Sequence, residues 1–256
     1  MKIDDIIKRR SMIWDFAVSD LKLRYRSSVL GFFWTFLEPL LMLLVLYIVF
    51  TNVFKSTIEL FPLYLLLGLI IWNMTVRGTQ IALSSIVSRK GVLSQIFVPL
   101  EIPVISSTIT ALIMLTFEMI VFTIFLVAFQ FIPPVTIVIL PLIIGIQFVL
   151  VLGISFPLAV INAKVRDMQF AWNVLLHAGF FLHPIFYKID ILPEQIRGII
   201  ELSPMVQVLN FARDASLYNE MPSTNEIAVT LGITFLIFII GYGIFIKFSK
   251  RIMEEI

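Results

Sequence analysis

Residues 135–162 read VTIVILPLIIGIQFVLVLGISFPLAVIN, an uninterrupted stretch without a single charged side chain. A helix needs about 20 apolar residues to cross the hydrocarbon core of a bilayer, so this stretch is long enough to span a membrane. Comparable apolar runs recur along the chain and predict further spans over 32–54, 61–83, 104–128, 172–187 and 228–246. The sequence therefore predicts an all-α integral membrane protein with six transmembrane helices.

The composition supports this fold class. The chain has 256 residues, of which 59% are hydrophobic and only 14% charged, whereas soluble proteins average roughly 45–50% and roughly 25%. Six spans use about 120 positions, which leaves too little chain for a large soluble domain. This argues against a soluble enzyme or a secreted module, and a net charge of +2 argues against nucleic acid as a partner. The absence of cysteine excludes disulfides and thiolate metal ligands.

The chain divides into an N-terminal segment (1–31), a six-span core (32–246) and a short tail (247–256), which together form a single domain. In the N-terminal segment, apolar residues recur at helical spacing between charges, which predicts an amphipathic helix at the membrane interface. Such a helix is either a simple surface anchor or a collar that a cytoplasmic partner grips. The apolar stripe consists of Ile3, Ile7, Trp14, Ala17, Leu21 and Tyr25.

Prolines interrupt the chain after the fifth expected span. Pro184, Pro193 and Pro204 break residues 188–227 into pieces, because proline ends or kinks a helix. Irregular backbone at membrane depth is tolerated only where protein buries it or where it lines a wet cavity. We therefore expect short re-entrant or interfacial helices between the fifth and sixth spans.

The distribution of positive charge predicts the orientation, because cytoplasmic segments are enriched in Lys and Arg. Four such residues lie on one side, namely Lys55, Lys188, Arg197 and Arg213, and Arg77 lies within a span. The remaining fourteen lie on the other side, so we expect both termini in the cytoplasm. These are Lys2, Lys8, Arg9, Arg10, Lys22, Arg24, Arg26, Arg89, Lys90, Lys164, Arg166, Lys247, Lys250 and Arg251.

Three charged residues fall within the expected spans, where charges are costly and therefore candidates for function: Glu38, Arg77 and Glu118. Glu38 and Arg77 lie about 9 and about 10 Å from the cytoplasmic ends of their spans, which predicts an intramembrane pair. The alternative is that each side chain reaches the inner interface separately. Glu118 lies about 21 Å deep, near the level expected for His183, and is expected to be a tolerated, protonated carboxyl group.

Aromatic residues form the second group of candidates: Trp34, Trp72, Phe180, Phe181, Phe186 and Tyr187. Several lie near predicted interfaces, where simple aromatic belts are common. The rings near the end of the fifth span are also suited to stacking on sugars in a channel.

Nucleotide and metal motifs are missing from the sequence. It contains no phosphate-binding loop of the form GxxxxGK[ST] and no HExxH. We therefore expect no catalytic residue, no metal site and no cofactor in this chain, and the energy for any transport must come from elsewhere.

Residues 20–34, DLKLRYRSSVLGFFW, followed by Pro39-Leu40, closely resemble the permease subunits of type 2 ABC exporters for polysaccharides. The resemblance continues almost to the end of the chain through shorter motifs. These are GLIIW at 68–72, NAKVRD at 162–167, PIFY at 184–187, ILP at 191–193 and Ser203-Pro204.

This resemblance implies a homodimeric permease that works with two copies of a separate ATPase, which binds ATP and Mg. It implies export of a lipid-linked glycan, such as O-antigen, capsule or teichoic acid, across the cytoplasmic membrane of a prokaryote. It also implies that residues 85–103 form the coupling helix that docks in the ATPase. Here Phe97-Val98-Pro99 lacks flanking basic residues, so Arg89, Lys90 and Glu101 are the nearest charged candidates beside Phe97 and Pro99.

The lipid head is expected to be taken up at the cytoplasmic face. Basic juxtamembrane clusters attract anionic lipid, which makes the N-terminal collar a candidate, and the loop after the fourth span faces either the partner or the lipid pyrophosphate. The residues concerned are Arg24, Tyr25, Arg26, Lys164, Arg166 and Asp167.

Three other functions remain open. The first is a type 2 ABC permease for small amphiphiles or drugs. The second is an integral membrane enzyme acting on polyprenyl-linked sugars, for which Asp190, Glu194 and Glu201 are the nearest acidic set. The third is a secondary transporter, which should show internal repeats that we do not find.

Overall fold

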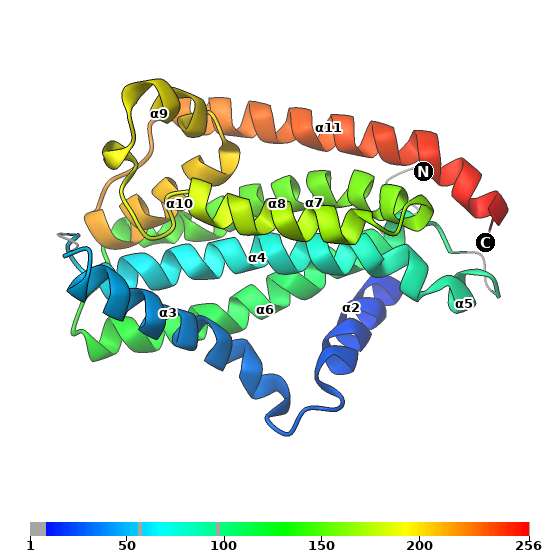
Figure 1. Ribbon diagram of the computed structural model, residues 1–256, viewed down its shortest axis with the longest axis horizontal. Coiled ribbons are helices and arrows are strands. Elements are labelled where there is room, and N and C mark those ends of the chain that lie inside the picture. Colours follow the sequence, from blue (N-terminus) through cyan, green and yellow to red (C-terminus); the bar gives the residue numbers. More distant parts are fainter. Residues whose placement is uncertain (1–8, 56–57, 96–97, 256) are drawn as a thin grey trace.

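The computed structural model describes residues 9–55, 58–95 and 98–255, and within these ranges the regular elements are helices (Figure 1). Five helical segments are long and apolar enough to cross a membrane. They comprise the 3-10 turn Gly31–Phe33 with α3 (Trp34–Asn52), α4 (Phe61–Ser88), α6 (Glu101–Ala128), the 3-10 turn Val135–Ile139 with α7 (Leu140–Lys164), and α11 (Thr224–Glu255). The all-α membrane-protein class predicted from the sequence is confirmed.

The expected fifth span is shorter than the others. Helix α8 runs over Met168–Leu182, 15 residues, which is about 22 Å at 1.5 Å per residue. It ends before Pro184 because a residue that precedes proline is pushed out of the helical region, and His183 is extended at ψ 145°. The sequence analysis placed this segment at 172–187, so the helix begins and ends earlier than expected.

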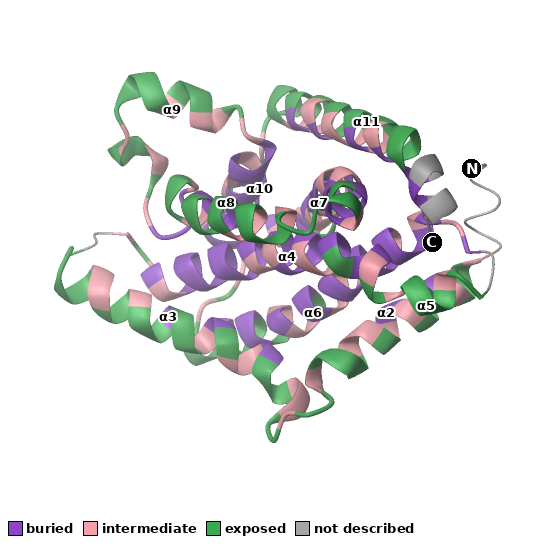
Figure 2. Ribbon diagram, turned by 45° about the vertical axis from the view of Figure 1, so that its right-hand side comes forward, coloured by how far each residue is buried: buried purple, intermediate pink, exposed green. Residues whose placement is uncertain are grey.

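Helix α4 is the centre of the molecule. It is buried along most of its length, whereas α3 and α11 expose a long outer face (Figure 2). Small residues let neighbours approach α4 closely: a Cβ on Gly78 would lie 2.5 Å from Val151 of α7. Small residues at helix interfaces serve this purpose in membranes, so α4 acts as the core against which α6 and α7 pack.

Helices α7 and α11 meet at two glycines. A Cβ on Gly153 would lie 2.8 Å from the Cα of Phe238, and one on Gly241 would lie 2.0 Å from the Gly153 carbonyl oxygen. Both neighbours are backbone atoms, which cannot move aside without separating the helices. The contact therefore depends on the absence of side chains at these positions.

Gly241→Ala should lower the thermal stability of the purified protein, because the new methyl group would clash with the α7 backbone. We expect a loss of about 1–3 kcal/mol, as for other overpacked contacts. Gly243→Ala is the matched control, since nothing lies within 4 Å of its Cβ position on the same helix. Equal melting temperatures for the two variants would show that the α7–α11 contact is looser than described.

The helix ends define two ends of the molecule. At one, called the α5 end, lie α2 (Arg10–Tyr25), the single-turn helix α5 (Lys90–Leu93) and the last residues of α11 (Figure 1). At the other, called the α9 end, lie the short helices α9 (Glu194–Glu201) and α10 (Pro204–Arg213). A 3-10 turn (Ile189–Ile191) precedes α9 and a π-helical turn (Asp214–Tyr218) follows α10.

Two expectations for the α5 end need correction. The described part of the expected coupling helix, 85–103, is the end of α4, one turn of α5 and the start of α6. Helix α2 does pack against the start of α6, but through Ile13 and Ala17. Trp14, expected on the apolar stripe, is 56% exposed, so the buried face is turned relative to the prediction.

Candidate functional site

Arg77 lies at the centre of a charge network that joins three helices. Its Nη2 donates to Glu38 Oε2 of α3 at 2.8 Å, and its Nη1 lies 2.7 Å from Glu118 Oε1 of α6. Asn73, one turn earlier on α4, donates to the same Glu118 oxygen at 3.4 Å. Glu118 is fully buried, whereas the Glu38 side chain is 56% exposed. One guanidinium thus bridges a buried and an accessible carboxylate.

The sequence analysis placed Glu38 beside Arg77, and the structure brings these two side chains together. It missed Glu118, which was expected near the level of His183. Helix α6 slopes across α4 (Figure 1), so depth increases along it by less than the 1.5 Å per residue assumed for an upright helix. Burial of the Glu118 carboxylate is therefore compensated by Arg77 and Asn73.

A second ion pair lies at the α5 end, between Arg89 at the end of α4 and Asp20 of α2. The Arg89 guanidinium also lies over the Phe16 ring, 4.9 Å from its centroid. Burial raises the pKa of Asp20, and the opposing effect of Arg89 is smaller. We call Phe16, Asp20 and Arg89 the clasp, because they hold α2 to the start of the 89–100 connection.

The other candidates in this connection differ in exposure. Lys90 is exposed, while Pro99 and Glu101 are half-buried. Phe97 lies outside the described residues. Since Arg89 is engaged within the chain, Lys90 and Glu101 are the charged side chains of this group that remain at the surface.

The residues expected to take up a lipid head form two separate groups. Arg24 lines a polar pocket of about 260 Å³ together with Asp20, Gln80 and Ser84. The Tyr25 hydroxyl shares a 2.8 Å hydrogen bond with Thr35 of α3, and Arg26 is exposed. Lys164, Arg166 and Asp167 are exposed on the α7–α8 turn. No hydrogen bond or ion pair joins the two groups within the described parts of the chain.

Most of the aromatic candidates form one cluster. Trp72 contacts Phe180, and Phe186 contacts Phe180, Phe181 and Tyr187, with ring centroids 5.3–6.3 Å apart. Trp34 lies apart from them at the start of α3 and is 40% exposed.

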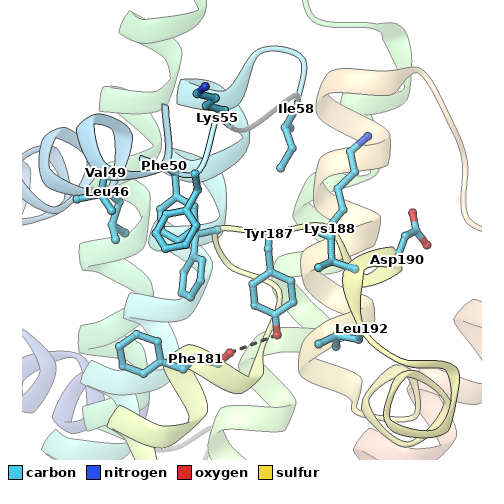
Figure 3. Close-up of a pocket in the computed structure, with 13 residues that line it drawn as sticks. Leu46, Val49, Phe50, Lys55, Ile58, Phe181, Tyr187, Lys188, Asp190 and Leu192 are labelled. Carbon is cyan, nitrogen blue, oxygen red and sulfur yellow. Dashed lines mark hydrogen bonds between the residues drawn. The ribbon is translucent and has the colours of Figure 1, made fainter. Parts of the chain in front are cut away.

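Sequence analysis missed two rings of α3 that extend this cluster. Phe50 lies 4.8 Å from Phe186 and 4.9 Å from Phe54. A residue spacing of four on one helix face was the available signal. Together these rings surround a pocket at the α9 end (Figure 3).

Arg213 was expected in an external loop but is buried, at 2% exposure. Its guanidinium donates to three backbone carbonyls: Tyr64 at 3.3 Å, Pro184 at 2.6 Å and Ile185 at 2.7 Å. It also lies 3.5 Å from the centroid of the Tyr64 ring. Gly68 makes room for it, because a Cβ there would lie 2.3 Å from Nη2. Arg213 therefore fastens α10 to α4 and to the segment after α8.

Asp214, the next residue, lies in the turn between α10 and α11, outside the membrane-spanning helices. Burial raises its pKa to about 6, and Glu220 adds to the effect. A raised pKa means that the folded state holds the proton more tightly. The contribution of Asp214 to stability is therefore full below about pH 4 and is lost as the pH rises through about 6.

Asp214→Asn should remove this loss and raise the melting temperature at pH 7.5 more than at pH 5. Because the carboxyl group is partly exposed and screened by water, we expect a gain of about 1 kcal/mol at pH 7.5. Asp167→Asn, on the exposed α7–α8 turn, is the control in the same melting series. A gain for Asp214→Asn that is equal at both pH values would contradict the assignment.

Comparisons with known proteins give one family. A family model described as ABC-2 type transporter matches residues 14–217. The O-antigen export system permease protein RfbA of Myxococcus xanthus is 26% identical over 99% of this chain and 98% of its own. The protein of the same name from Klebsiella pneumoniae is 25% identical over 92% and 91%. The polysialic acid transport protein KpsM of Escherichia coli is 23% identical over 85% and 87%.

Proposed function

The chain belongs to the ABC-2 type transporter family, and from this membership we propose that it is the membrane-spanning permease subunit of an ATP-driven exporter of lipid-linked polysaccharide. One observation carries the proposal. The similarity to permeases named for O-antigen export covers 92–99% of this chain, so it includes both ends of the molecule and all five long helices. The permease itself breaks no covalent bond.

The proposed topology has six spans. Helix α8 and the extended residues that follow it form the fifth span, and α9 and α10 return into the outer leaflet. The α5 end then faces the cytoplasm with both termini, as the excess of Lys and Arg on that side favours. The membrane is the cytoplasmic membrane of a prokaryote, as for the three bacterial relatives.

ATP is hydrolysed by a separate partner, because the sequence has no phosphate-binding loop. We propose that two copies of this ATPase, each with ATP and Mg, dock on a homodimer of the permease. Lys90, Pro99 and Glu101 would contact the ATPase, since they lie at the surface of the 89–100 connection and its end. ATP binding would act by favouring one of two arrangements of the helices.

The clasp gives this motion a route into the membrane. Arg89 holds the connection to α2 through Asp20, and α2 is joined to α3 through Tyr25 and Thr35. Three residues further along α3, Glu38 contacts the Arg77 network. Displacement of the connection would thus reach the centre of the bundle through paired side chains.

Asp20→Asn should uncouple ATP hydrolysis from export, because the neutral amide cannot hold Arg89 as an ion pair. In a permease–ATPase complex we expect export to fall about tenfold while ATP hydrolysis stays within about twofold, a coupling of about 1.4 kcal/mol. Asp15→Asn, exposed on the same helix, is the matched control. A parallel loss of both activities would indicate a folding or docking defect instead.

The polysaccharide would pass between the two protomers. Glu38 is charged and half-exposed on a helix that is otherwise apolar, and such a residue faces protein or water rather than lipid. Arg24, Tyr25 and Arg26, with Lys164, Arg166 and Asp167, would attract the anionic lipid head at the cytoplasmic face. Trp34, Trp72 and Phe180 are proposed as rings along which sugars stack.

Co-purification and genetics together test this function. We expect the tagged chain, extracted in mild detergent, to retain an ATPase in a two-to-two complex, which mass photometry measures. Deletion of the gene should leave lipid-linked glycan inside the cell, which labelling of the intact cell surface detects. An ATPase partner with unchanged surface glycan would favour export of small amphiphiles.

The enzyme alternative loses support from the acidic loop. Asp190 and Glu201 both pair with Arg197, at 3.0 and 2.7 Å. Two of its three carboxylates are thus held in an ion-pair cluster instead of facing a shared metal or substrate. Glu194 is exposed at the start of α9.

A further inference from the structure

A large pocket opens at the α9 end, between the last turns of α3 and the segment that follows α8. Its volume is about 950 Å³, within the range of sites that bury small ligands. The interior is apolar and largely aromatic, with Leu46, Phe50, Phe54, Phe181, Phe186 and Tyr187. Figure 3 shows the rings of Phe50, Phe181 and Tyr187 around this space. Such a surface fits hydrocarbon.

Positive charge lies at one side of the pocket. Lys55 and Lys188 both line it, and Figure 3 shows their amino groups above the aromatic rings. Asp190, the carboxylate that also lines the pocket, is paired with Arg197 at 3.0 Å. Within the described residues, no ion pair joins Lys55 or Lys188 to a carboxylate. The mouth therefore presents two ammonium groups whose charge is available to an anion.

The depth of the lysines matches a lipid headgroup. Lys55 follows Glu38 by 17 residues along the α3 segment, which is about 25 Å of helix. Since the hydrocarbon core is about 30 Å thick, Lys55 lies near the interface opposite the α5 end. Hydrocarbon would extend from there into the apolar interior, and phosphate would stay at the level of the lysines.

We propose that this pocket binds the lipid anchor of the exported polysaccharide in the outer leaflet, with the prenyl or acyl chain among the rings and the phosphate between Lys55 and Lys188. The proposal rests on the proposed function. It assigns Phe181, Phe186 and Tyr187 to hydrocarbon and not to sugar, because stacked sugars also need hydroxyl partners and the interior offers few. The site holds the anchor after transfer, before release into the membrane.

Binding of short prenyl compounds tests the site without glycan or ATPase. The full chain in phosphatidylcholine nanodiscs is titrated with farnesyl phosphate, farnesol or inorganic phosphate, and binding is followed by native mass spectrometry. We expect farnesyl phosphate to bind about tenfold more tightly than farnesol, since two charge-assisted contacts are added, and more tightly than inorganic phosphate. The paired substitution Lys55→Gln with Lys188→Gln should remove the advantage over farnesol.

Two further variants separate the parts of the site. Lys247→Gln, exposed near the end of α11, removes one positive charge elsewhere and should leave farnesyl phosphate binding unchanged. Val49→Trp, which fills the pocket, should weaken farnesyl phosphate and farnesol alike.

Three results would overturn the proposal. The first is equal binding of farnesyl phosphate by the wild type and the double lysine variant, and the second is inorganic phosphate binding as tightly as farnesyl phosphate. The third is displacement of farnesyl phosphate by a soluble oligosaccharide of the exported glycan, which would assign the rings to sugar. Prenyl phosphate binding in a protein that exports no glycan would refute the proposed function and leave the site standing.

Discussion

Arg77→Leu is expected to cause one of the two largest losses of stability in this protein. The substitution leaves Glu118 fully buried without its guanidinium partner. Breaking a buried ion pair by removing one partner costs about 3–5 kcal/mol, a large part of a total stability of roughly 5–15 kcal/mol. Heating followed by size-exclusion chromatography with fluorescence detection measures the loss as a drop in the midpoint temperature.

A second substitution separates loss of charge from loss of packing. Arg77→Leu combined with Glu118→Leu removes both buried charges and should be more stable than Arg77→Leu alone. The difference is the interaction energy of a double-mutant cycle, which reaches about 0.5–3 kcal/mol for residues in contact. Strict additivity of the two single effects would show that Arg77 and Glu118 are not coupled.

Glu38 offers a matched comparison within the same network. Its side chain is 56% exposed and contacts the same guanidinium at 2.8 Å. Because solvent can replace Arg77 around an exposed carboxylate, Glu38→Gln should cost about 1 kcal/mol or less. A loss as large as that of Arg77→Leu would mean that Glu38 is buried in the native assembly, which the homodimer would explain.

Arg213→Leu is expected to cause the other large loss. It leaves the carbonyls of Tyr64, Pro184 and Ile185 without their donor, and each buried unsatisfied group costs about 1–3 kcal/mol. The contact between the guanidinium and the Tyr64 ring is lost as well. We expect the protein either to accumulate poorly or to melt at a much lower temperature, and export to fail because α10 is no longer fastened.

Arg213→Lys and Arg197→Leu are the controls for this position. A single ammonium group cannot reproduce the planar fork that serves several carbonyls at once, so lysine should recover only part of the stability. Arg197 is a partly exposed arginine of α9 with two carboxylate partners, and its loss should cost about 1 kcal/mol or less. Equal losses for Arg197→Leu and Arg213→Leu would contradict the role assigned to the buried guanidinium.

Properties that depend on neighbouring residues along the chain followed from the sequence alone. The apolar runs predicted the five long helices, because the length of a membrane span is a count of consecutive residues. Pro184 predicted that the helix of the fifth segment would stop nearby, and α8 ends at Leu182. Glu38 and Arg77 were paired from depth alone, since they lie on consecutive spans at similar distances from the same side.

Properties that depend on packing between distant segments were decided only by the tertiary structure. Glu118 meets Arg77 because α6 slopes across α4, and Arg213 reaches α4 because α10 folds back into the bundle. Asp20 and Arg89 are 69 residues apart in the chain, so no local pattern indicates the clasp. The pocket with Lys55 and Lys188 likewise forms where α3 meets the segment after α8. The physical reason is common to all four: a buried charge or a cavity takes its properties from residues that folding brings near it.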